Sequence, residues 1–220
     1  MLIFGNSNDV FNDTNQENNQ KGTISDVPEN FGLSLAQDTQ NAESLFNKLM
    51  ADMQGAKNDP ETISFWTFDN EKGERIPFSK FSEVSGLAVD SDFQKIIDEK
   101  NYNLFFCTSK NSEKDMGVLF NAKIIEDYYE DSVKFMKEWE KTLITNSQKI
   151  IFSNVDIPKD VLQGQNVKFI NNFYGRYAKF VSLDGVQRVI FYKVLDDSIY
   201  ITSSLECAQQ VSRGLESEEP

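Results

Sequence analysis

The most constraining feature of this sequence is the stretch 187–215, close to its C-terminal end. Residues 187–195 form a β-branched and aromatic run, the pair Asp196-Asp197 interrupts it, and residues 198–202 resume it. This pattern predicts two antiparallel strands joined by an acidic turn. Ser203 or Ser204 then offers a hydroxyl for the start of a helix, and an apolar stripe follows at helical spacing. The stripe consists of Leu205, Ala208, Val211 and Leu215.

Strand-like and helix-like segments alternate along the rest of the chain. The longest expected helix places Trp139 on its apolar face, where we expect the indole to be buried. Gly86 should end a helix, and Asp184-Gly185 should form a hairpin turn. Further strands are expected at 31–36, 62–69, 102–109, 116–124, 149–153, 167–173 and 176–183. Further helices are expected at about 41–54, 77–84, 91–100 and 127–145.

These elements predict an α+β fold of mainly antiparallel sheets with helices packed on one face. Two similar lobes are one possible arrangement, because the segment 104–109 resembles the segment 199–204. The expected division is a flexible linker at 1–23, a first α+β lobe at 24–125, a second at 126–215 and an acidic tail at 216–220.

Composition and motifs argue against several classes of function. The 220 residues carry a net charge of −13, which disfavours nucleic acid as a partner. The chain has no histidine, which excludes Ser-His-Asp and Cys-His catalysis and imidazole-bound metals. Asp90 and Asp92 resemble the start of a calcium loop, but Lys95 stands where that loop needs glycine. We therefore expect a protein that is not an enzyme, with no catalytic residues, no metal site and no cofactor.

The two cysteines are too few for a disulfide framework or a cysteine-only zinc site. Cys107 lies in an expected strand and Cys207 in the last expected helix. The sequence does not indicate whether they meet. Two buried free thiols are the interpretation we favour, and one disulfide is the alternative.

Aromatic side chains are numerous, and most of them are explained by core packing. The cluster least typical of a core mixes polar side chains with three rings near residue 174. If a partner-binding surface exists, we expect it there. The candidate binding residues are Asn171, Asn172, Phe173, Tyr174, Arg176 and Tyr177.

The N-terminal end is apolar for residues 1–4 and becomes polar abruptly at Asn6. Lys21 is the only lysine or arginine before Lys48, and such scarcity is typical of the outer side of a membrane span. We therefore expect the gene to extend upstream and to encode about 20 apolar residues that anchor the protein in a membrane.

Three segments of the chain are VPENFGLS at 27–34, FMKEWEKT at 135–142 and SIYITSSLE at 198–206. Together they resemble a group of uncharacterised membrane-anchored envelope proteins of small-genome bacteria, and the resemblance spans about residues 24–215. It implies an extracytoplasmic location and the architecture, and it carries over no activity and no functional residues.

The sequence thus predicts a non-enzymatic extracytoplasmic domain of a membrane-tethered protein that binds another envelope component. One alternative is a soluble cytoplasmic binding or accessory protein. Another is a hydrolase that uses acidic residues.

Overall fold

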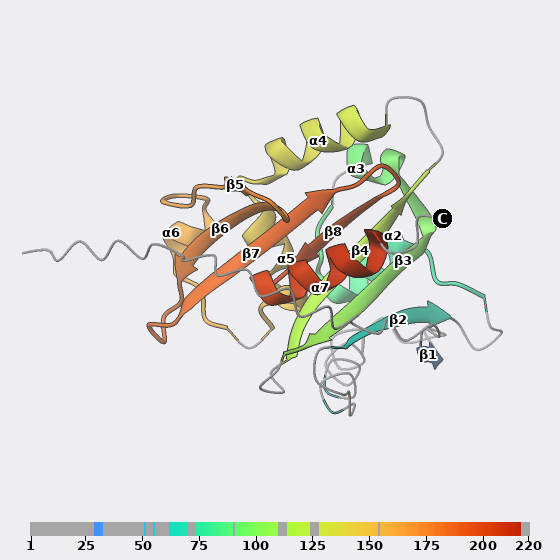
Figure 1. Cartoon of the computed structure of the whole chain (residues 1–220), viewed down its shortest axis with the longest axis horizontal. Helices are drawn as coiled ribbons and strands as arrows, with labels where there is room; N and C mark the ends of the chain where they lie inside the picture. Colours follow the sequence, from blue (N-terminus) through green and yellow to red (C-terminus); the bar gives the residue numbers. More distant parts are fainter. Residues whose placement is uncertain are drawn as a thin grey trace, which may run out of the picture.

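One eight-stranded β-sheet runs through the computed structural model of this protein, in the order β1-β2-β3-β4-β8-β7-β6-β5 (Figure 1). Neighbouring strands are antiparallel except β1 and β2, which are parallel. The strands are β1 (Glu29–Gly32), β2 (Ile63–Asp69), β3 (Ile97–Thr108), β4 (Lys114–Ala122), β5 (Ile170–Asn172), β6 (Gly175–Val181), β7 (Gln187–Val194) and β8 (Ser198–Thr202). The helices are α2 (Phe78–Ser85), α3 (Ser91–Ile96), α4 (Tyr128–Trp139), α5 (Leu143–Ile151), α6 (Lys159–Leu162) and α7 (Leu205–Glu216). The expected α+β fold is confirmed.

The structure describes residues 29–32, 51, 55, 62–69, 74–89, 91–109, 114–123, 128–153 and 155–216. The expected linker, the acidic tail beyond Glu216 and nearly all of the helix expected at 41–54 lie outside these residues.

Two antiparallel meanders make up most of the sheet. β2, β3 and β4 form one, β5 to β8 form the other, and the pairing of β4 with β8 joins them. Strands from both expected lobes therefore belong to one sheet, and the larger core contains side chains from both. The similarity of the two lobes stays a prediction.

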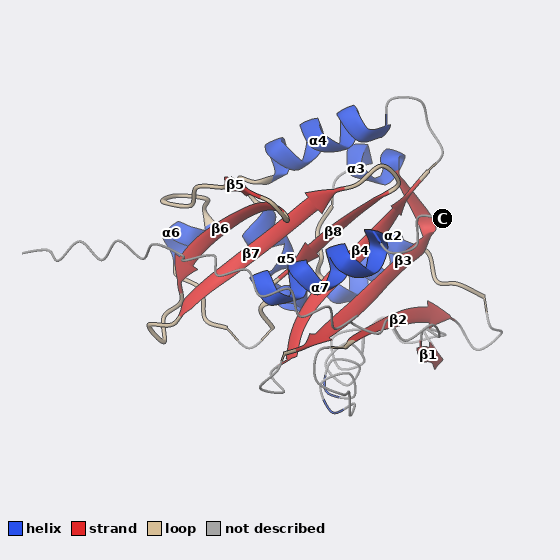
Figure 2. Ribbon diagram, in the orientation of Figure 1, coloured by secondary structure: helices blue, strands red, loops and turns tan. Residues whose placement is uncertain are grey.

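The two faces of the sheet carry different helices (Figure 2). Side chains of α2 to α6 pack on one face, in a core that includes Phe78, Phe93, Trp139, Ile150 and Val161. Cys207, Ala208 and Val211 of α7 pack on the other face, in a smaller core. The expectation of helices on one face is therefore wrong for the last helix. Sheet residues alternate between these cores, because successive side chains of a strand point to opposite faces.

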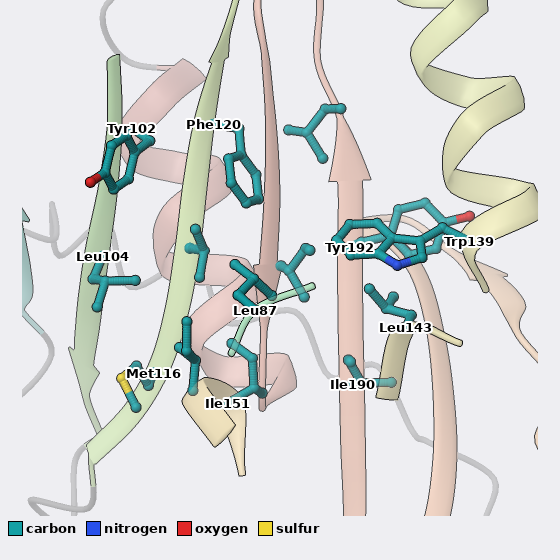
Figure 3. Close-up of a cluster of buried hydrophobic side chains, with 14 of the residues drawn as sticks. Leu87, Tyr102, Leu104, Met116, Phe120, Trp139, Leu143, Ile151, Ile190 and Tyr192 are labelled. Atoms are coloured by element: carbon teal, nitrogen blue, oxygen red, sulfur yellow. The ribbon is translucent and has the colours of Figure 1, made fainter. Parts of the chain in front are cut away.

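Aromatic rings fill the larger core. Phe93 packs with its ring centroid 5.2 Å from that of Trp139 and 5.0 Å from that of Phe120. Trp139 is 5% exposed, as the helical pattern predicted. Figure 3 shows Trp139 reaching from α4 toward the sheet beside Tyr192.

Two expected elements differ from the structure between residues 127 and 153. The long helix ends at Trp139, and a second helix, α5, begins at Leu143 after a turn. The strand expected at 149–153 is wrong, because residues up to Ile151 belong to α5. The buried residues of α5 recur at helical spacing from the end of the expected helix, near residue 145, into the expected strand at 149–153. They are Leu143, Ile144, Ser147, Ile150 and Ile151.

The helix expected at 91–100 is also too long. α3 ends at Ile96 and β3 begins at Ile97. Both isoleucines are buried, so an apolar pair at this position fits the end of a helix and the start of a strand equally well. A register shift between Ile97 and Tyr102 follows, which marks an irregular start of the β3–β4 pairing.

The C-terminal hairpin and helix agree with the sequence pattern. Ser204 Oγ accepts a hydrogen bond from the backbone N–H of Cys207 at 3.1 Å, which is the expected cap at the start of α7. Gly86 follows α2 in the left-handed conformation, with φ of 69°. A side chain is rarely tolerated there, so the glycine ends the helix as predicted.

A disulfide links Cys107 of β3 to Cys207 of α7. The two Cα atoms lie 5.3 Å apart and both side chains are buried. The favoured interpretation of two free thiols is therefore wrong. No sequence pattern could reveal the pairing, because the cysteines are 100 residues apart and meet only through the β3–β4–β8 arrangement and the return of α7.

Candidate functional site

The candidate binding residues lie in the β5–β6 hairpin, at one edge of the sheet (Figure 1). Ile170 pairs with Tyr177, Asn171 with Arg176 and Asn172 with Gly175, so Phe173 and Tyr174 form the loop. The side chain of Asn172 accepts a hydrogen bond from the backbone N–H of Tyr174 at 3.1 Å, which closes the turn. Gly175 has a φ of 139°, and a Cβ atom there would collide with the carbonyl oxygen of Tyr192. The turn therefore depends on Asn172 and on Gly175, which pair with each other across the hairpin.

Arg176 fixes one face of the hairpin to the end of α4. Its Nε lies 2.6 Å from Oε1 of Glu140, and its Nη2 lies 3.2 Å from Oε2. The same guanidinium donates to Asn171 Oδ1 at 2.5 Å and to the carbonyl oxygen of Phe169 at 3.3 Å. Two-point binding of a carboxylate restricts the guanidinium more than a single contact does. Arg176 thus links its own strand, β6, to Asn171 of β5 and to Glu140 at the end of α4.

Tyr192 completes this network. Its hydroxyl donates to Glu140 Oε1 at 2.5 Å, and Arg176 Nε lies 3.1 Å from the same hydroxyl. Burial, with a further contribution from Glu140, raises the pKa of Tyr192 above its usual range, and the hydrogen bond to Glu140 raises the pKa of Arg176. The phenol stays protonated and the guanidinium stays charged at neutral pH. The phenol and the guanidinium therefore both act as hydrogen-bond donors to Glu140, which suits them to holding the hairpin in place.

Tyr200 fixes the other face of the hairpin. Its buried ring belongs to the core under α7, and its hydroxyl donates to the carbonyl oxygen of Tyr174 at 2.9 Å. The same hydroxyl lies 2.8 Å from Ser212 Oγ of α7. The loop of the hairpin is therefore tied to the core on both sides of the sheet.

Phe173 projects from this fixed loop with 87% of its surface exposed. Its main aromatic neighbour is Tyr174, whose ring lies edge-on at a centroid distance of 5.1 Å. Ile170, at the edge of the same hairpin, is also exposed. A phenylalanine this exposed contributes nothing to the core, while its backbone is held in place. Such a side chain is suited to act as a preorganised anchor for a partner.

The structure brings the six candidate residues together but gives them different roles. Phe173 is presented to solvent, Arg176 points toward α4, and Tyr177 lies on the opposite face against Phe191. Sequence reasoning missed Glu140, Tyr192 and Tyr200. Glu140 is 36 residues from Arg176 and sits in a run of charged residues, so its sequence context gives no signal of a specific partner.

Among the described residues, no group of acidic or cysteine side chains could hold a metal ion. In that part of the chain no helix has both the length and the apolar character needed to span a membrane. Comparison of the chain with family models, curated proteins and solved structures finds no match.

Proposed function

We propose that this chain is a non-enzymatic extracytoplasmic domain of a membrane-tethered protein and that it binds another protein of the cell envelope through the β5–β6 hairpin. The observation that carries the proposal is the exposed ring of Phe173 on a loop that is hydrogen-bonded on both faces. A fixed backbone lowers the entropy lost when the side chain is buried by a partner. Aromatic residues of this kind dominate the affinity of many protein interfaces.

The disulfide supports the proposed compartment. Structural disulfides persist in oxidising environments such as the space outside the cytoplasmic membrane, and they are rare in reducing cytosol. Cys107 and Cys207 are buried together and link a central strand to the last helix, which is the setting of a structural bridge.

The compartment is tested with the full reading frame in its own host cell. Thiols are blocked with an alkylating reagent in intact cells before lysis, and the cell fractions are then separated. We expect the chain in the membrane fraction, sensitive to external protease once any outer barrier is permeabilised, with Cys107 and Cys207 oxidised. Recovery in the cytosol with both thiols alkylated would contradict the proposal.

Partner binding is tested by placing a photo-crosslinking amino acid at position 173. The matched control position is 183, because Leu183 is also exposed, at 69%, and lies in the other hairpin of β6. We expect a discrete crosslinked product from position 173 that is absent from position 183. Unlabelled wild-type protein should compete for that product, whereas the Phe173→Ser variant should not. Equal labelling from both positions would show non-specific contact and would overturn the role of the hairpin.

A further inference from the structure

The face of the sheet that carries α7 is only partly covered by that helix. α7 packs against β3 and β7, and in Figure 1 it crosses the middle of the sheet, away from β5 and β6. The side chains of β6 show the consequence. Ala178 and Phe180, which point to the face of α2 to α6, are buried, whereas Lys179 and Val181 on the α7 face are exposed.

This area is here called the open face. Its exposed residues are Ile170, Lys179 and Val181, and its half-buried residues are Tyr177 and Val189, which adjoin the core under α7. Residues paired across neighbouring strands point to the same face, and the register places Ile170 opposite Tyr177 and Lys179 opposite Val189. Ile170 is 43% exposed and Val181 is 52% exposed. The exposed apolar side chains of Ile170 and Val181 share this face with Lys179 and with Gln187, which pairs with Val181. Exposed apolar side chains beside a half-buried core indicate an interaction surface.

Charge gives the chemistry of the occupant. Residues 168–193 contain five basic residues and one acidic residue, a net charge of +4, so the remainder of the chain carries −17. Arg176 and Arg188 are paired with Glu140 and Asp184. In contrast, Lys179 has no ion-pair partner among the described residues, and its ammonium lies 5.9 Å from the centroid of the Tyr177 ring. An acidic partner would be attracted to this cation.

The width of the open face fits one helix. Neighbouring strands lie about 4.8 Å apart, so β5 and β6 together present a strip about 10 Å wide. An α-helix with its side chains is about 10 Å across. α7 already shows how a helix packs on the adjacent part of the same face, with small and branched side chains toward the sheet.

We propose that the open face binds an acidic amphipathic helix of a partner protein, which lies beside α7 and places its acidic side chains near Lys179. The inference rests on the proposed function, since it names the chemistry of the partner and the surface next to the hairpin that receives it. Neither nucleic acid nor an anionic membrane fits as well, because each presents a dense array of phosphates, whereas Lys179 is the one cation among the five residues of the open face.

The test uses the purified full chain and two fluorescent helical peptides that share one leucine face. Glutamate occupies the polar face of one peptide and lysine that of the other. We expect saturable binding of the glutamate peptide and none of the lysine peptide at the same concentration, with affinity falling as salt is raised. Lys179→Glu should weaken binding about fivefold, since an attractive contact becomes a repulsive one. Val181→Ser should weaken it as well, through the apolar contact.

Controls lie on α4, which packs on the opposite face of the sheet. Lys137→Glu and Tyr129→Ser change an exposed cation and an exposed apolar side chain there, and both should bind like the parent. Binding that ignores Lys179→Glu, or that is equal for both peptides, would overturn the proposal. So would Lys179-dependent binding to phosphatidylglycerol vesicles or self-association abolished by the same substitution. These measurements need no cellular partner, so their outcome is independent of the fractionation and crosslinking tests of the proposed function.

Discussion

The disulfide between Cys107 and Cys207 should contribute a large share of the stability of this domain. A cross-link lowers the conformational entropy of the unfolded chain, and its effect grows with the length of the loop it closes. The two cysteines are separated by 100 residues, for which the loop-closure relation gives about 4.7 kcal/mol at 25 °C. Because the free energy of unfolding of a whole domain is commonly only about 5–15 kcal/mol, loss of this bridge should cause a large, readily measured decrease in it.

The measurement is urea denaturation of the parent chain with and without dithiothreitol, followed by tryptophan fluorescence. Reduction breaks the link and leaves both cysteine side chains in place, so no core side chain is removed or truncated. We expect the free energy of unfolding to fall by about 4–5 kcal/mol on reduction. The dependence on urea should also steepen, because the unlinked chain exposes more surface when it unfolds.

A double variant, Cys107→Ala with Cys207→Ala, provides the control. Its stability should be indifferent to dithiothreitol, and it should resemble the reduced parent apart from the loss of the two sulfur atoms. The reasoning would be refuted if the oxidised parent, with no free thiol detectable after unfolding, gained less than about 1 kcal/mol from the bridge. Titration of two free thiols in the purified, unfolded chain would refute the bridge itself.

Three further perturbations test the packing. Trp139→Ala should lower the free energy of unfolding by about 3–5 kcal/mol in urea denaturation, and Trp139→Phe by clearly less, because the indole is buried among the rings of the larger core. Gly117→Ala should cost about 1–3 kcal/mol, measured as a lower melting temperature, because a Cβ atom would meet the ring of Phe105 and lie 2.5 Å from a carbonyl oxygen of β8. Burial raises the pKa of Tyr128 to about 12, so the unfolded chain should lose this proton from about pH 10 while the folded chain keeps it. Stability should then fall by about 1.4 kcal/mol per pH unit between pH 10 and 12, and Tyr128→Phe should reduce that slope.

Local patterns predicted most of the strands because each one carries its own signal. In β2, Ile63 and Phe65 face one core while Trp66 and Phe68 face the other, so apolar residues occupy both sides of the strand. A strand covered on both faces carries apolar residues at odd and even positions alike, as the sequence Ile-Ser-Phe-Trp-Thr-Phe-Asp does. The turns at Gly86 and Gly185 were predictable for a related reason, since both adopt positive φ.

The division between α4 and α5 could not be predicted because no residue there marks it. Trp139 and Leu143 are four residues apart, the spacing of one continuous helix face, and neither glycine nor proline lies between them. The chain nevertheless turns, with the N–H of Thr142 bonded to the carbonyl oxygen of Trp139 at 2.9 Å. The isoleucines at the end of α5 were mistaken for a strand because β-branched residues favour strands when only local preference is considered.

The candidate site was predictable only in part. The mixture of asparagine, glycine and rings at 171–177 indicated the aromatic cluster least typical of a core, and Phe173 in it is exposed. The contacts that hold the hairpin come from Glu140 and Tyr200, which reach it through tertiary structure. Sequence reasoning could therefore find the exposed residues, but it could not find the residues that make their position fixed.

The helix stripe of 205–215 shows why the open face escaped prediction as well. The stripe establishes that α7 buries one side, but it contains nothing that selects a face of the sheet. Among the described helices, α7 is the one that packs on this face, and geometry limits how much of the face it covers. Eight strands at a spacing of about 4.8 Å span about 34 Å, whereas one helix is about 10 Å across. A single helix therefore leaves strands beyond its reach, and at the β5–β6 edge those strands carry Ile170 and Val181. These exposed apolar side chains, beside Lys179, are the reason why we propose that a partner helix binds at this edge.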